Sequence, residues 1–227
     1  RQERREALVA KLARHGASRV EFVDAVDGRA LAREHPERVA HVRVYTDEVA
    51  DLMPKEGAIG CFLSHYAAHR RAAQLQLQTY LVLEDDATFR FDERDGLRFR
   101  MAMQQLPAGW DSLWLGYNPY FRPSSSKCCR PPERTPCGRD DRALCRAKAR
   151  LVDAHAIMFH ARAQRWLLPL LAPIESSNVS ILPYDLALRF YMEQHRDAAV
   201  YAVSPMPLVL QNKSFASDIS TYGGTGT

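Results

Sequence analysis

Three consecutive carboxylates, Glu84, Asp85 and Asp86, follow a short apolar run and are the residues of this chain best suited to chemistry. The run, residues 80–83, is too short for an independent helix and is typical of an interior strand of a covered sheet. Ligands of open α/β sheets bind beyond the carboxyl ends of the strands. Because adjacent acids repel each other, a hard divalent cation with oxygen ligands stabilises such a cluster. The segment therefore predicts a metal and phosphate site.

The acidic cluster also has simpler explanations. Acids after a strand can cap the next helix or face solvent without binding anything. Periodicity alone does not separate a short buried strand from a buried helix. The residues alone do not decide between these alternatives and a metal site.

The composition is that of a globular chain with a mildly basic charge. With 227 residues, 46% of them hydrophobic, the chain can bury a full core, and we expect a single domain over 1–227. The formal net charge of +4 suits an anionic donor, an anionic acceptor or a membrane surface. No zinc-finger or helix-turn-helix spacing is present, so we expect no nucleic-acid partner. No apolar run approaches the roughly 20 residues that span a bilayer, and we expect no transmembrane segment.

The cysteines bear on the cellular compartment. Within residues 118–147, a Pro- and Arg-rich stretch that we interpret as an insertion, lie Cys128, Cys129, Cys137 and Cys145. Two disulfides and a zinc knot are the alternatives, and the adjacency of Cys128 and Cys129 favours disulfides. Disulfides, with glycosylation acceptors at Asn178 and Asn212, favour the lumen of the secretory pathway. The alternative is a cytoplasmic, membrane-associated protein.

Helix-like and strand-like segments alternate along the chain. The periodicity predicts helices over 2–16, 57–78, 91–107, 161–171 and 185–195. It predicts strands over 19–28, 80–83, 111–117, 151–160 and 201–211. Residues 29–56 are expected to form a surface excursion, and the chain from 212 a flexible tail. This alternation is typical of a mostly parallel central sheet flanked by helices.

Four patches in this order resemble glycosyltransferase family 25, which includes lipooligosaccharide and procollagen galactosyltransferases. They are FVDAVDG, GAIGCFLSHYAAHR, YLVLEDDATF and a closing PLVLQ followed by SDIS. The most specific part is Gly60-Cys61 followed by Ser64-His65, about twenty residues before the acidic cluster. The resemblance covers nearly the whole chain except the cysteine-bearing insertion.

The resemblance implies a GT-A-like α/β fold with a mostly parallel sheet and a Rossmann-like nucleotide-binding half. It implies transfer of a hexose, galactose before glucose, from a UDP-sugar to a hydroxyl of a glycan or glycoprotein, with inversion and with Mn²⁺ or Mg²⁺. A catalytically inactive nucleotide-sugar-binding module remains an alternative. So does a metal-dependent phosphohydrolase, which also uses strand-end acids.

Roles for single residues follow from this resemblance. Glu84 and Asp86 occupy the outer positions of an acid-x-acid motif and are the expected metal ligands. The expected donor-binding residues are Asp27, Gly28, Ser64, His65, Asp85 and Gln211. A plain Asp-Gly turn, a surface serine and a structural histidine are the simpler alternatives for the first four. His65 and His69 lie one helical turn apart, which is also compatible with zinc ligation.

Asp185 is the expected catalytic base, because it matches the later acidic position of the family and heads a predicted helix. Asp is also a favoured helix N-cap, worth about 1 kcal/mol, so capping is the alternative role. Asp153 is the second candidate base. Ser217 and Asp218 resemble the closing patch of the family and are expected to line the site from the tail.

Overall fold

A computed structural model of the chain describes residues 2–14, 19–44, 55–89, 93–117, 129–130, 143–147, 151, 153–172, 180–195, 197–204 and 206–211. The chain divides into two compact units. Unit 1 contains Arg1–Glu21, Leu77–Ala163 and Leu188–Asn212, and unit 2 contains Phe22–Gln76, Gln164–Ala187 and Lys213–Thr227. The expectation of one domain over 1–227 stays a prediction.

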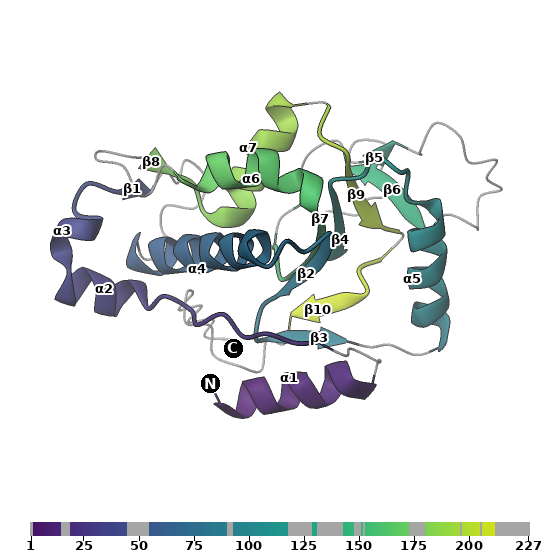
Figure 1. Cartoon of the computed structure of the whole chain (residues 1–227), viewed down its shortest axis with the longest axis horizontal. Coiled ribbons are helices and arrows are strands. Elements are labelled where there is room, and N and C mark those ends of the chain that lie inside the picture. The colour runs from purple at the N-terminus through teal and green to yellow at the C-terminus, as the bar shows by residue number, and fades with distance from the viewer. Residues whose placement is uncertain are drawn as a thin grey trace, which may run out of the picture. The chain divides into compact units, whose positions relative to one another are not determined.

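Unit 1 is built on a mixed β-sheet (Figure 1). Its strand order is β2 (Thr79–Leu83), β7 (Ala156–His160), β4 (Ser112–Gly116), β9 (Val200–Val203), β6 (Leu144–Ala147) and β5 (Cys129–Arg130). Along this path β4 and β9 are parallel, and the other neighbours are antiparallel. Two more strands, β3 (Ala87–Phe89) and β10 (Val209–Gln211), pair antiparallel with each other, and β10 is parallel to β4.

The expected mostly parallel sheet is therefore wrong. Parallel neighbours need a long crossover, usually a helix, between them. The sequence shows no helical period between the strand that ends near Tyr117 and the one that ends at His160. The second of these, β7, lies antiparallel between β2 and β4. The apolar pattern within a strand carries no information on its direction, and the missing crossover helix was the signal that the sequence did offer.

The strand β2 is also not the interior strand that its apolar run suggested. It is the first strand in the sheet order, and β7 is its partner in the described part of the chain. Its burial alternates at the start, because Tyr80 is buried whereas Leu81 is 37% exposed. A short apolar run predicts a strand, but it does not separate an edge strand from a central one.

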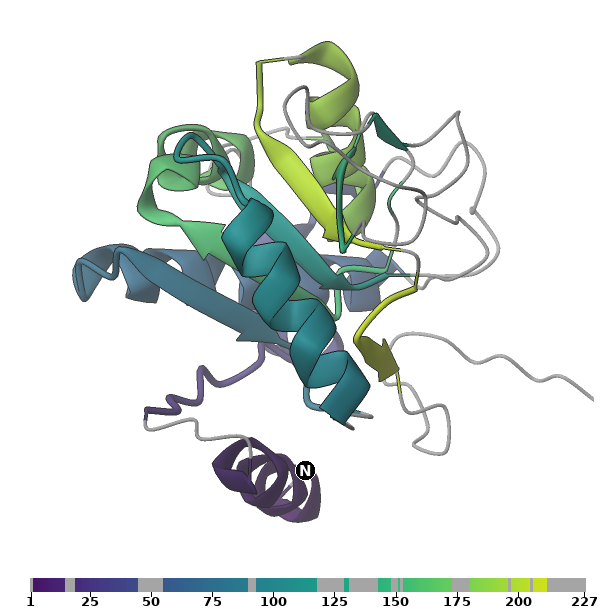
Figure 2. The ribbon, with the colours of Figure 1, turned by 90° about the vertical axis from the view of Figure 1, so that its right-hand side faces the viewer.

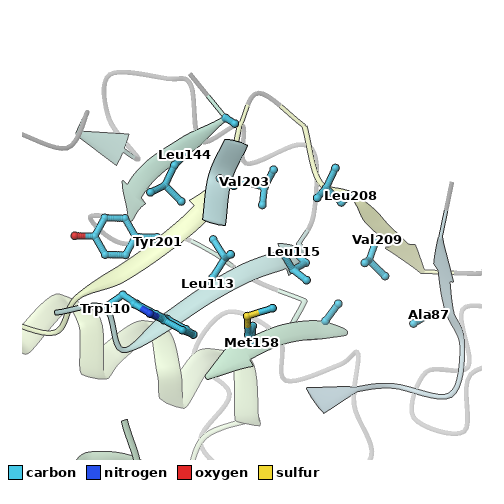
Figure 3. Packing of buried hydrophobic residues seen from close by; sticks show 13 residues of the cluster. Ala87, Trp110, Leu113, Leu115, Leu144, Met158, Tyr201, Val203, Leu208 and Val209 are labelled. Carbon is cyan, nitrogen blue, oxygen red and sulfur yellow. The ribbon is translucent and has the colours of Figure 1, made fainter. Parts of the chain in front are cut away.

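The core of unit 1 lies between the sheet and α5 (Glu93–Gln105), which contacts β6 and β9 and lies in front of the strands in Figure 2. The sheet contributes Leu113, Leu115 and Val203, which are fully buried and lie in one layer in Figure 3. From the helix, Phe99, Ala102 and Met103 pack against this layer. Their i, i+3, i+4 spacing is the stripe of a helix on a core, and the predicted helix over 91–107 is confirmed.

Unit 2 is organised around one long helix, α4 (Lys55–Gln74). The helices α2 (Gly28–Glu34) and α6 (Gln164–Leu171) contact α4, and α3 (Pro36–Val39) contacts α2 (Figure 1). The short strands β1 (Arg43–Val44) and β8 (Ser180–Ile181) form a separate parallel pair. The predicted helix over 57–78 is confirmed, and its buried face includes Ile59, Phe62 and Tyr66.

Several other predicted elements are confirmed and some are corrected. Helices form at α1 (Gln2–Arg14), η1 (Ala161–Ala163) with α6, and α7 (Tyr184–Gln194), as expected. The predicted strand over 19–28 is wrong, because residues 19–27 form no strand and α2 begins at Gly28. Val20 and Phe22 are about 40% exposed there. The predicted strand over 201–211 is two strands, β9 and β10. The predicted surface excursion contains α2, α3 and β1.

The cysteine prediction is confirmed for one residue. Cys145 in β6 is disulfide-bonded, whereas Cys61 in α4 is a reduced cysteine outside any disulfide among the described residues. Cys128, Cys137 and the side chain of Cys129 lie outside the described residues, as does the tail with Ser217 and Asp218. None of the helices in the described ranges has both the length and the hydropathy to cross a bilayer.

Two glycines allow the start of α2 to lie directly on α4. A Cβ atom on Gly60 would stand 2.6 Å from Val26 O and 2.8 Å from Gly28 N. A Cβ atom on Gly28 would stand 1.7 Å from Glu56 O. Since these neighbours are backbone atoms, only a shift of a whole segment would make room. Close backbone approach therefore explains both glycines.

We expect Gly60→Ala to lower the free energy of unfolding by about 1–3 kcal/mol, as overpacking of a well-packed site does. Gly96→Ala is the matched control, because the nearest atom to its added Cβ would be the flexible end of Arg100 at 3.6 Å. That change is expected to stabilise α5 by up to about 1 kcal/mol, since Ala is the better helix former. Urea unfolding measures both, and equal stability of the two variants would contradict the close approach.

Candidate functional site

The three carboxylates lie in a tight turn of unit 1, residues 84–87, which we call the acidic turn. Glu84 N donates a hydrogen bond to His155 O (3.0 Å), which extends the pairing of β2 with β7 by one residue. Ala87 N donates to Glu84 O (3.1 Å) and closes a four-residue turn that leads into β3. Asp85 and Asp86 therefore occupy the two central positions of a β-turn.

Asp86 has one buried carboxylate oxygen. Its side chain is half-buried, and its Oδ1 atom is fully buried and accepts no hydrogen bond from the described residues. Burial, followed by the negative charge of Glu84, raises the pKa of Asp86 to about 6. A hydrogen bond from the Gln211 side chain and the nearby His155 ring act in the opposite direction on this pKa.

Pairing of β3 with β10 brings Gln211 to the acidic turn, because Gln211 is the register partner of Ala87. Gln211 and Asp86 are 125 positions apart in the sequence (211 minus 86). The structure thus places the predicted residues Glu84, Asp85, Asp86 and Gln211 together. Their roles in binding metal and donor stay predictions.

His155 belongs to this site and was missed by the sequence analysis. It is 3% exposed, and its Nε2 lies 3.0 Å from Val209 O. Because a carbonyl only accepts, Nε2 carries the proton in the neutral ring. The ring packs on Gly116, where an added Cβ would lie 2.5 Å from two ring atoms. A lone histidine before a strand gives no sequence signal, and its partner is 54 residues away.

The residues around the acidic turn fit a divalent cation. Three buried polar atoms have no hydrogen-bond partner within the described ranges: Asp86 Oδ1, Thr88 Oγ1 and His155 Nδ1. A buried polar atom without a partner costs free energy, and an ion or ligand is a common explanation. Carboxylate oxygens are the ligands that Mg²⁺ prefers and that Mn²⁺ also accepts.

In unit 2, Asp27 and Ser64 make local structural contacts. Asp27 is the N-cap of α2, and its Oδ1 accepts hydrogen bonds from Arg29 N and Ala30 N, both at 3.0 Å. The Ser64 hydroxyl donates to Gly60 O (2.6 Å) and accepts from Val26 N (2.9 Å). Ser64 therefore ties α4 to the segment before α2. The predicted donor-binding roles of Asp27, Gly28 and Ser64 stay predictions.

His65 and His69 lie on the buried face of α4 and both contact Tyr184. The His65 ring stacks on the Tyr184 ring with centroids 3.8 Å apart and planes 6° apart. His69 is fully buried, and its Nε2 lies 2.7 Å from the Tyr184 hydroxyl. One ring nitrogen of His69 is thus occupied, which argues against zinc ligation by this pair. Asp185 follows Tyr184 in the first turn of α7 and is half-buried.

Burial, and then the proximity of His65, lowers the pKa of His69 from its ordinary value of 6.5 to about 3. Below pH 6.5, His69 therefore binds a proton in the unfolded chain but stays neutral in the folded protein. We expect the free energy of unfolding to fall as the pH drops from 6.5, at up to about 1.4 kcal/mol per pH unit from this residue.

Urea unfolding between pH 7.5 and pH 5 measures this loss. His69→Gln should show a shallower pH dependence than the unsubstituted protein. The exposed His195 serves as the control, because His195→Gln should retain the full dependence. Parallel curves for the unsubstituted protein and His69→Gln would contradict the assignment.

Comparison with known proteins decides the family. The model of "Glycosyltransferase family 25 (LPS biosynthesis protein)" matches residues 1–116, which include α4 and the acidic turn. The chain belongs to glycosyltransferase family 25. The predicted resemblance is thus confirmed. Asp185, Gln211 and His155 lie beyond the part of this family 25 chain that the family model matches.

Curated relatives within family 25 match a similar part of the chain. Procollagen galactosyltransferase 2 of Homo sapiens is 29% identical over 119 residues, which cover 51% of this chain and 19% of the human protein. Procollagen galactosyltransferase 1 of Danio rerio is 30% identical over 119 residues, 51% of this chain and 20% of the fish protein.

Some relatives in family 25 are named as inactive. Inactive glycosyltransferase 25 family member 3 of Mus musculus is 34% identical over 104 residues, 42% of this chain and 17% of the mouse protein. The match thus spans about a fifth of the length of these relatives. Membership of family 25 alone therefore does not decide whether the chain is catalytic.

Proposed function

We propose that this family 25 protein is a metal-dependent hexosyltransferase that moves galactose, in preference to glucose, from a UDP-sugar to a hydroxyl of a glycan or glycoprotein. The observation that carries the proposal is the acidic turn, where one oxygen of the half-buried Asp86 accepts no hydrogen bond from the described residues and two further carboxylates are adjacent in sequence. A positive ligand stabilises such a cluster in its ionised form. The names of the procollagen relatives support galactose.

Glu84 and Asp86 would hold the Mn²⁺ or Mg²⁺ ion, and Asp85, which is exposed, would face the donor sugar. When bound, such an ion stabilises the negative charge that develops on the departing diphosphate. Gln211 orients the Asp86 carboxylate through its hydrogen bond. His155 links β10 to the acidic turn, because its backbone carbonyl accepts a hydrogen bond from Glu84 N and its ring Nε2 lies 3.0 Å from Val209 O.

Asp185 is the proposed base. Its carboxylate would take the proton of the acceptor hydroxyl while that oxygen attacks the anomeric carbon of the donor sugar. The bond between this carbon and the phosphate oxygen breaks with inversion, and UDP leaves with the bonding electrons. His65, Ser64, Asp27 and Gly28 are proposed for donor binding, alongside the structural contacts that they make.

The experiment is a donor screen with the purified protein and a panel of glycan and peptide acceptors. We expect acceptor-stimulated release of UDP from UDP-galactose, which a chelator abolishes and added Mn²⁺ restores. Metal removal should leave the fold intact, because the core of unit 1 is built from hydrophobic side chains. UDP release that is insensitive to chelation would contradict the proposed metal role.

A catalytically silent module that binds nucleotide sugars is the second candidate, and the inactive mouse relative is the observation in its favour. Such a protein would bind UDP without turning over any donor. A metal-dependent phosphohydrolase would instead cleave the UDP-sugar without stimulation by an acceptor. The donor screen separates all three functions.

A further inference from the structure

Tyr184 is the first residue of α7, and α4 holds it at both its ring and its hydroxyl. His65 and His69 are four residues apart, so they lie on the same face of α4. His65 covers the flat face of the Tyr184 ring, and His69 Nε2 meets its hydroxyl at 2.7 Å. The three side chains are at most 6% exposed, so the contacts are shielded from water.

These contacts fix the orientation of the tyrosine. The orientation of a tyrosine ring is set by two side-chain torsion angles, χ1 and χ2. Face-to-face stacking sets the plane of the ring, and the hydrogen bond sets the direction in which the ring axis points. The Tyr184 backbone, and with it the first turn of α7, is therefore held relative to α4. Ala187 N donates to Pro183 O (2.8 Å), which begins the helical bonding at this point.

Asp185 is the next residue, so its direction depends on the same turn of helix. A general base must lie within hydrogen-bond reach of the proton that it takes, and a small misplacement costs much of the rate. If the first turn of α7 could shift relative to α4, the carboxylate of Asp185 would be misplaced. We propose that Tyr184, held by His65 and His69, is the positioning residue for the base Asp185. This inference rests on the proposed function of Asp185.

The main test is Tyr184→Phe, which keeps the stacking ring and removes only the hydroxyl. We expect kcat to fall about tenfold, while the KM for UDP-galactose stays within about twofold, because the donor site is intact. The matched control is Tyr191→Phe in the same helix, where the ring also stacks on a histidine, His195, at 4.1 Å. That variant should keep its kcat.

A double variant of Tyr184 and Asp185 tests whether the loss of kcat in Tyr184→Phe acts through Asp185 or reflects a general structural role. Adding Tyr184→Phe to Asp185→Asn should cause no further loss of the residual transfer, because no base remains to be positioned. Losses that multiply, or full kcat in folded Tyr184→Phe, would overturn the proposal. Should Tyr184→Phe not fold, kcat is compared in His69→Gln and His69→Leu. The amide of Gln can meet the hydroxyl, so more kcat in the Gln variant supports the proposal and equal kcat overturns it.

The failure of this inference can be told apart from the failure of the proposed function. An active Asp185→Asn contradicts the base itself, and with it the positioning of that base. An inactive Asp185→Asn together with a fully active Tyr184→Phe contradicts the positioning alone.

Discussion

Asp86→Asn is expected to lower galactose transfer by a factor on the order of 10³, because a catalytic cation contributes several kcal/mol of charge stabilisation. Asparagine keeps the shape of the side chain but removes the negative charge that would hold the ion. The stability of the folded protein should not fall. The fold raises the pKa of Asp86, so the ionised carboxylate that predominates at neutral pH destabilises the folded state, and replacing it should leave stability unchanged or increase it.

The measurements for Asp86→Asn are UDP release with acceptor present and urea unfolding of the same preparation. Asp197→Asn is the control, since Asp197 is an exposed aspartate of unit 1. It should retain both transfer and its dependence on Mn²⁺. A fully active Asp86→Asn whose transfer a chelator still abolishes would show that the ion is held elsewhere.

Asp185→Asn should reduce kcat by about 10²–10⁴-fold, the usual contribution of a general base. Its affinity for UDP should remain near that of the unsubstituted protein, because the change removes a proton acceptor and no proposed nucleotide contact. Asparagine is also a good residue near a helix start, so α7 should persist. Calorimetric titration with UDP and steady-state kinetics on the same variant separate the two effects.

A control on the same helix tests whether the loss of kcat is specific to Asp185. Glu193 pairs with Arg189 four residues away, at 3.1 Å, near the other end of α7. Glu193→Gln removes a carboxylate from the helix without touching its first turn, and transfer should be unaffected. If Asp185→Asn were as active as Glu193→Gln, the role of Asp185 would be limited to the helix.

The elements with a strong period were predictable from the sequence, and their arrangement was not. The stripe of α5, Phe99, Ala102 and Met103, indicates both the helix and the face that it buries. The apolar residues of β7 do not show its direction, because a buried strand has a similar apolar composition in parallel and antiparallel sheets. The predicted strand over 19–28 is wrong, since Val20 and Phe22 are about 40% exposed and are not buried against a sheet.

The candidate site was predictable where its residues are adjacent in the chain. The acidic turn is one such segment, since charge repulsion among neighbours can be inferred from sequence alone. His155 was not predictable, because its meaning depends on Val209 and Gly116, on two other strands. Tyr184 and His69 meet across 115 residues, and only the fold shows that contact. Asp27 is the N-cap of α2, a role that the sequence analysis did not predict, since its alternative for Asp27 was a plain Asp-Gly turn.

The central claim is that the acidic turn holds a divalent cation that a UDP-sugar needs. Anomalous diffraction from crystals soaked with MnCl₂ and UDP tests it most directly. We predict one strong manganese peak beside the carboxylates of Glu84 and Asp86, and its loss in crystals of Asp86→Asn. Bound UDP with no manganese at the acidic turn, or a manganese peak that Asp86→Asn leaves in place, would contradict the account.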